Sequence, residues 1–129
     1  MHWAAPLIGA PYEAGACGPS SFDCIGLVRF YFRHRHGIEL PDYLLHSGSA
    51  RQLYRFIRAT GWRCVAGPEQ ADDVLTMTGL AGKHVGVVVG TVEGLRLLHA
   101  VGSDKRGQVV AQHLRPLPGY MDIRIWRRA

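Results

Sequence analysis

One cysteine and two histidines have the residue types and the order along the chain that nucleophilic catalysis requires. Cys24 lies in the N-terminal part of the sequence, and His84 and His99 follow in the C-terminal half. In such sites a sulfur attacks a carbonyl carbon, an imidazole takes the thiol proton, and a third group orients that imidazole. We therefore interpret Cys24 as a candidate nucleophile, His84 as its base and His99 as the residue that holds the His84 ring.

The cysteine is predicted to lie in the first turn of a helix. Asp23 suits the N-cap, where its carboxylate accepts an otherwise unpaired backbone N–H, and Gly37 suits the left-handed position after the last turn. Apolar residues between them cover most of the circumference, so this helix is expected to be central to the fold. The positive end of its dipole would favour the Cys24 thiolate over the thiol, and the backbone N–H of Cys24 would help stabilise an oxyanion.

The two histidines are predicted to lie near the outer ends of a β-hairpin formed by residues 82–90 and 94–100. Side chains alternate between the faces of a strand, so His84 and His99 share a face only if the turn has an even number of residues or a bulge intervenes. A four-residue turn at 90–93 or 91–94 meets this condition. Gly86, on the same face as His84, would leave room for another element to approach closely.

The remaining pattern indicates an α+β fold. Residues 1–19 are predicted to form a loop or short helix, and residues 49–60 a second helix ended by Gly61. Further strands are predicted at 62–65, 74–77, 109–113 and 120–126. Because helices come first and antiparallel strands follow, we expect one α+β domain over residues 1–129.

Composition narrows the classes of protein and partner. The chain is 47% hydrophobic and 19% charged, which fits a globular domain, and we expect no membrane span. The N-terminus lacks the pattern of a secretory signal, so we expect cytoplasmic synthesis without ordinary export. A net charge of +5 would attract polyanions such as nucleic acid or cell wall. Nucleic acid is the weaker expectation, because the basic residues are scattered and form no recognised binding motif.

The three cysteines do not suggest a structural disulfide framework, because their number is odd. A metal site built from Cys17, Cys24 and some of the seven histidines is an alternative, but the cysteine spacing matches structural zinc sites poorly. We therefore expect no metal ion and no other cofactor. Cys17 and Cys64 are interpreted as small core residues.

Several motifs, in their order along the chain, resemble those of the NlpC/P60 cysteine peptidases. They are Pro11-Tyr12, residues 23–28, residues 84–90 and residues 98–100, and the resemblance spans residues 9 to about 126. Residues 37–43 and 73–75 further resemble the short branch of that family found in tail assemblies of phages and prophages.

The resemblance implies a papain-like α+β fold, with N-terminal helices packed on an antiparallel sheet. It implies hydrolysis of peptide bonds in bacterial peptidoglycan, typically the bond between D-γ-glutamate and a diamino acid. Cys24, His84 and His99 would be catalytic, and Tyr12 and Asp23 would form the substrate-binding and oxyanion side of the site.

The phage-type branch further implies tail proteins as partners, and action in the periplasm or cell wall from within a tail or virion. Two departures from the family pattern stand out. Ile25 follows the cysteine where Ser or Trp is common, and residues 79–83 ahead of His84 match the family loosely, which affects the expected lid over the site.

Two functions of other classes stay open. The domain could be a structural component of a phage tail in which the site is idle. Alternatively, it could be a thiol acyltransferase or amidase, because the same cysteine and histidine groups serve any acyl substrate.

Overall fold

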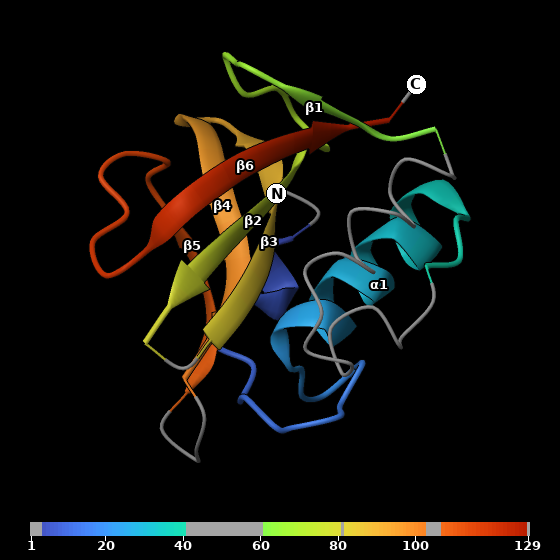
Figure 1. The fold of residues 1–129 in the computed structure, drawn as a ribbon. Coiled ribbons are helices and arrows are strands. Elements are labelled where there is room, and N and C mark those ends of the chain that lie inside the picture. The colour runs from blue at the N-terminus through green and yellow to red at the C-terminus, as the bar shows by residue number, and fades with distance from the viewer. Residues whose placement is uncertain (1–3, 41–60, 81, 103–106, 129) are drawn as a thin grey trace.

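A helix and an antiparallel sheet make up most of the chain. The computed structural model describes residues 4–40, 61–80, 82–102 and 107–128. In Figure 1 the helix α1 (Cys24–His36) lies beside a twisted sheet whose strands all come later in the sequence. This arrangement confirms the predicted α+β class. The second helix predicted at residues 49–60 lies outside the described residues.

Helix α1 begins and ends at the predicted residues. The N-cap Asp23 accepts the backbone N–H of Gly26 at 2.7 Å, and Gly37 adopts the left-handed conformation at the C-terminus with φ 67°. Before α1, the opening segment contains a short 3-10 helix, η1 (Ala5–Leu7). Leu27 and Phe32 of α1 are fully buried, as expected for a central helix.

The opening segment packs directly on the first turn of α1. A Cβ added to Gly26 would lie 1.9 Å from the backbone oxygen of Ala16, so only glycine fits at this position. The second carboxylate oxygen of Asp23 accepts the backbone N–H of Gly15 at 2.8 Å. The Asp23 carboxylate thus binds the loop to the first turn of the helix, and the absence of a side chain at Gly26 lets the two segments approach closely.

The sheet has the strand order β1-β6-β2-β3-β4-β5, and each neighbouring pair is antiparallel. The strands are β1 (Arg63–Val65), β2 (Val74–Gly79), β3 (Gly82–Thr91), β4 (Gly94–Val101), β5 (Gln108–Gln112) and β6 (Met121–Arg127). Each corresponds to a predicted strand, with small shifts at the ends.

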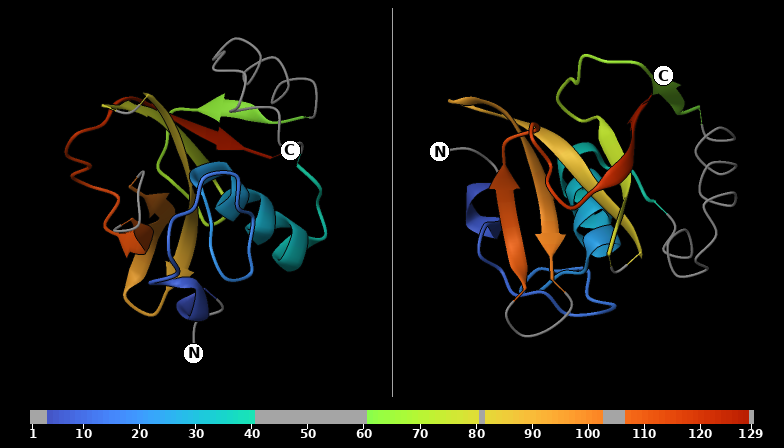
Figure 2. Two further views of the ribbon diagram at one scale, coloured as in Figure 1. Left: turned by 90° about the horizontal axis from the view of Figure 1, so that it is seen from below. Right: turned by 60° about the vertical axis from the view of Figure 1, so that its left-hand side comes forward.

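Apolar side chains are buried on both faces of the sheet. Helix α1 covers one face (Figure 2), where Leu27 and Phe32 pack with Val87 and Leu98. A smaller cluster on the other face includes Val88 and Leu97, and the segment between β5 and β6 packs against it through residues 114, 117 and 120. The sheet is therefore the middle layer of the domain.

The turn between β3 and β4 is shorter than predicted. Thr91 pairs with Gly94, so the turn contains two residues, Val92 and Glu93, instead of four. Two is also an even number, and the faces of the strands therefore match as the predicted arrangement requires. His84 and His99 lie on the same face of the sheet.

Candidate active site

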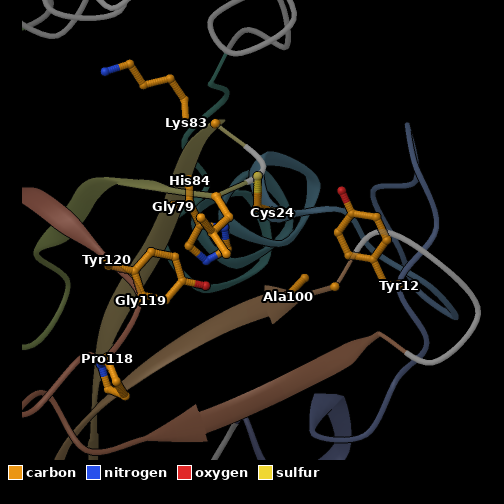
Figure 3. Close-up of a pocket in the computed structure, with 12 residues that line it drawn as sticks. Tyr12, Cys24, Gly79, Lys83, His84, Ala100, Pro118, Gly119 and Tyr120 are labelled. Atoms are coloured by element: carbon orange, nitrogen blue, oxygen red, sulfur yellow. The ribbon is translucent and has the colours of Figure 1, made fainter.

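A pocket of about 470 Å³ lies where the opening segment, the start of α1 and the ends of β3 and β4 meet (Figure 3). It is lined by Tyr12, Cys24, Gly79, Leu80, Gly82, Lys83, His84, Ala100, Gly102, Pro118, Gly119 and Tyr120. Three of the five predicted site residues, Tyr12, Cys24 and His84, are therefore in its wall. His99 lies fully buried behind His84, and Asp23 does not line the pocket.

Cys24 is placed where β3 and β4 stop pairing. The pairing between these strands ends at Val87 and Leu98, and nearer the site β3 pairs with β2 while β4 pairs with β5. The Cys24 sulfur lies against the backbone N–H of Val85 on β3, while Ala100 of β4 lines the same pocket. The start of α1 thus places the thiol beside both strands, at the ends that line the pocket.

The two predicted histidines are in direct contact. His84 Nε2 lies 2.7 Å from His99 Nδ1, and the two rings meet nearly edge to face, at an interplanar angle of 65°. The contact depends on Gly86. A Cβ at that position would lie 3.0 Å from the Cβ of His99 and 2.7 Å from Cδ1 of Leu97, so the predicted close approach is made by β4.

Tyr120 is a site residue that the sequence analysis missed. Its ring stacks on His84 with a centroid distance of 5.1 Å and an interplanar angle of 19°. Figure 3 shows Tyr12 and Tyr120 on opposite sides of Cys24. Tyr120 follows a turn at residues 116–119, and we interpreted it as the start of a strand. The signal that could have found it is an aromatic residue after a proline- and glycine-rich turn, like Tyr12 in the opening loop.

Gln112, at the end of β5, is a second residue that the sequence analysis missed. Its Oε1 lies 2.6 Å from Nε2 of His99. In the β4–β5 ladder, Gln112 pairs with Leu97, which makes it the diagonal neighbour of His99 on the same face. No sequence signal identifies this contact, because it depends on the register in which two separate strands pair.

Burial is the main influence on the protonation of Cys24 and His84. It raises the pKa of Cys24 to about 11, with a further contribution from the Asp23 carboxylate, and the nearby backbone N–H groups lower it by less. Burial and the neighbouring His99 lower the pKa of His84 to about 4. The prediction that the helix terminus favours the thiolate is therefore wrong for this structure. Desolvation outweighs the dipole, and the pair is a thiol and a neutral imidazole at neutral pH.

Tyr12 and Asp23 both lie close to Cys24, whereas Cys64 is exposed. Burial, together with nearby Cys24 and Asp23, raises the pKa of Tyr12, whose side chain borders the cysteine. The two Asp23 oxygens accept backbone N–H groups of Gly15 and Gly26, so the carboxylate is already engaged. Cys64 is exposed, and its interpretation as a core residue is wrong.

Within the described ranges, no group of three or more His, Cys, Asp or Glu side chains is arranged to hold a metal ion. No helix in the described part of the chain is long and apolar enough to cross a membrane.

Solved structures share this fold. NlpC2 from Trichomonas vaginalis superposes with a TM-score of 0.67 and 21% identity, covering 97% of this chain and 44% of that one. The NlpC/p60 domain of peptidoglycan hydrolase SagA superposes with a TM-score of 0.61 and 22% identity, covering 95% of this chain and 91% of that one. These likenesses establish the papain-like α+β fold of NlpC/P60 domains.

Sequence comparison gives the family itself. Tail tip assembly protein K of Escherichia phage N15 is 36% identical over 102 residues, which covers 73% of this chain. The chain spans about two fifths of the length of that relative, 39%. The model of the NlpC/P60 family matches residues 9–116, which is most of the sequence and contains the cysteine, both histidines and Gln112. The chain belongs to the NlpC/P60 family.

Proposed function

We propose that the protein is a cysteine peptidase that hydrolyses peptidoglycan stem peptides at the bond between D-γ-glutamate and a diamino acid. The observation that carries the proposal is the pair of histidines joined at 2.7 Å beside Cys24 in one open pocket. Membership of the NlpC/P60 family, and the fold shared with the NlpC/p60 domain of a peptidoglycan hydrolase, support this choice of substrate.

In the proposed reaction His84 acts as a general base. Its Nε2 is engaged with His99, so Nδ1 is the ring nitrogen available to the cysteine. As Cys24 Sγ attacks the carbonyl carbon, the thiol proton moves to Nδ1 of His84, and this imidazolium then protonates the departing amine. Water hydrolyses the resulting thioester with His84 again as base. The neutral starting state follows from the raised pKa of Cys24 and the lowered pKa of His84.

The two tyrosines have proposed roles at the walls of the pocket. Tyr12 lies near Cys24 and carries a hydroxyl that is suited to donate to the developing oxyanion, together with the backbone N–H of Cys24. Tyr120 shields one face of the His84 ring. We assign Asp23 to positioning, because it fixes the first turn of α1 and the loop at Gly15.

The proposal is tested with defined stem peptides containing the γ-D-glutamyl bond, analysed by mass spectrometry of the products. The wild-type protein should release two fragments, and Cys24→Ala, at the same concentration and with unchanged circular dichroism, should release none. Peptides with an ordinary α-linked glutamate serve as the substrate control. A folded wild-type protein that leaves all the peptides intact between about pH 5 and pH 9 contradicts the proposal, because that range covers the titration of cysteine and histidine.

A structural role in a phage tail is a second candidate, because the relative in phage N15 is named a tail tip assembly protein. In this case the partners are tail proteins and the protein is located in the virion. Tails that assemble and infect normally with Cys24→Ala would favour the structural role. Assembled tails that fail to infect would favour the peptidase.

A further inference from the structure

We infer that Gln112 is a positioning residue of the active site, which fixes the tautomers of both histidines so that the lone pair of His84 Nδ1 is available to Cys24. This inference rests on the proposed function, since it assigns the way in which the proposed base is prepared. The residue lies outside the pocket wall and touches neither the cysteine nor the space for substrate.

The geometry places three side chains in a row across three neighbouring strands. His84 is on β3, His99 on β4 and Gln112 on β5, and all three project from the same face. The distances between facing atoms are 2.7 Å from His84 to His99 and 2.6 Å from His99 to Gln112. Both are hydrogen-bond distances, so a proton must lie between each pair of atoms.

The position of each proton follows from Gln112, the last of the three side chains. The facing atom of Gln112 is its amide oxygen, which has no hydrogen and can only accept. His99 Nε2 must therefore carry the proton, and in a neutral ring its Nδ1 is then an acceptor. His84 Nε2 donates to that acceptor, which leaves Nδ1 of His84 without a proton. This is the state that a general base needs.

Without the amide oxygen of Gln112, nothing fixes which ring nitrogen donates and which accepts in the hydrogen bond between the two histidines. His99 could then carry its proton on Nδ1 and donate to His84 Nε2, which would place the His84 proton on Nδ1. A base in this tautomer cannot accept the thiol proton until it rearranges. The hydrogen bond with Gln112 also opposes the effect of burial on His99: burial lowers the pKa of His99, and this hydrogen bond raises it.

The test compares three substitutions at Gln112 with one control on the same strand. Gln112→Met keeps the length of the side chain but removes the acceptor, Gln112→Lys supplies a donor, and Gln112→Glu keeps an acceptor. Gln108→Met is the control, because Gln108 lies on the same face at the exposed start of β5. Thermal unfolding of each variant establishes that it is folded before any comparison.

The first readout is independent of catalysis. Correlation of ring protons with ring nitrogens by NMR identifies which nitrogen of each histidine is protonated. We expect His99 protonated on Nε2 in the wild-type protein, in Gln112→Glu and in Gln108→Met. In Gln112→Met we expect a mixture of tautomers, and in Gln112→Lys the Nδ1-protonated form. An unchanged His99 tautomer in folded Gln112→Met and Gln112→Lys overturns the inference, whether or not the protein cleaves peptidoglycan.

The second readout is the rate of peptide cleavage. We expect kcat to fall about tenfold in Gln112→Met, and by about a thousandfold or more in Gln112→Lys, which imposes the wrong tautomer. Gln112→Glu should retain most of the activity, and KM should stay unchanged because Gln112 does not line the pocket. Equal losses in Gln112→Glu and Gln112→Lys would contradict the inference. Failure of the wild-type protein to cleave any peptide would instead contradict the proposed function and leave the NMR result to decide the role of Gln112.

Discussion

The half-buried His84 ring should make the folded state sensitive to acid over a defined range of pH. The pKa of His84 falls from 6.5 to about 4 on folding, because burial and the neighbouring His99 disfavour the imidazolium. A group whose pKa is lower in the folded state stabilises the fold above its unfolded pKa and loses that contribution as pH falls toward the folded value. At about 1.36 kcal/mol for each pH unit, this stabilisation amounts to about 3 kcal/mol, lost between about pH 6.5 and pH 4.

The experiment measures urea unfolding of the wild-type protein and of His84→Gln at intervals from about pH 7 to pH 4. Glutamine does not titrate, so the difference in unfolding free energy between the two proteins isolates His84 from the many carboxylates that protonate in acid. The difference should shift by about 3 kcal/mol in favour of the variant as pH falls. His113→Gln makes the same exchange of residue type at an exposed position and is the control for the exchange itself. If His84→Gln and wild type lose stability in parallel, His84 is not held neutral by burial and the reasoning is refuted.

Three further predictions concern the helix terminus and the pocket. Gly26→Ala should destabilise the fold by about 3 kcal/mol in urea unfolding, because its Cβ would meet the backbone oxygen of Ala16, whereas Gly90→Ala, where the new Cβ meets nothing within 4 Å, should change stability by less than about 1 kcal/mol. Alkylation of Cys24, followed by peptide mapping, should be slow at neutral pH and continue to rise above about pH 9, as the raised pKa of its thiol requires; rapid alkylation at about pH 6 would show a preformed thiolate. Tyr120→Ala should raise the pKa of the imidazole on which it stacks, measured by NMR titration, because water gains access to that ring, while Tyr120→Phe should leave this pKa close to the wild-type value.

The sequence predicted the parts of the fold that depend on local chemistry. Asp23 and Gly37 define α1 at the predicted residues because capping groups act on adjacent backbone. The shared face of His84 and His99 was predictable in principle from the alternation of side chains, although the two-residue turn was not. Val92 and Glu93 have no strong turn propensity, and the positive φ of Gly94 is what closes the hairpin.

The parts that could not be predicted depend on contacts between distant segments. Gln112 meets His99 only because β5 pairs with β4 in one particular register. Tyr120 reaches His84 because the segment after β5 folds back over the sheet. The direction in which the pKa of Cys24 changes depends on how deeply tertiary packing buries the thiol, and the helix dipole alone predicted a change in the opposite direction.

The pairing between β3 and β4 ends before it reaches the pocket. The pocket is therefore built from two kinds of structure, strand residues and connecting segments, which differ in how well they tolerate sequence change. The proposed proton path runs from side chain to side chain across three neighbouring strands, whereas the surrounding wall comes largely from connecting segments, such as those around Tyr12, Leu80 and Pro118. Connecting segments tolerate replacement and insertion far better than paired strands do. If these segments are exchanged, the proposed reacting groups stay in place, so the proposed function predicts a change of substrate preference without a change of chemistry.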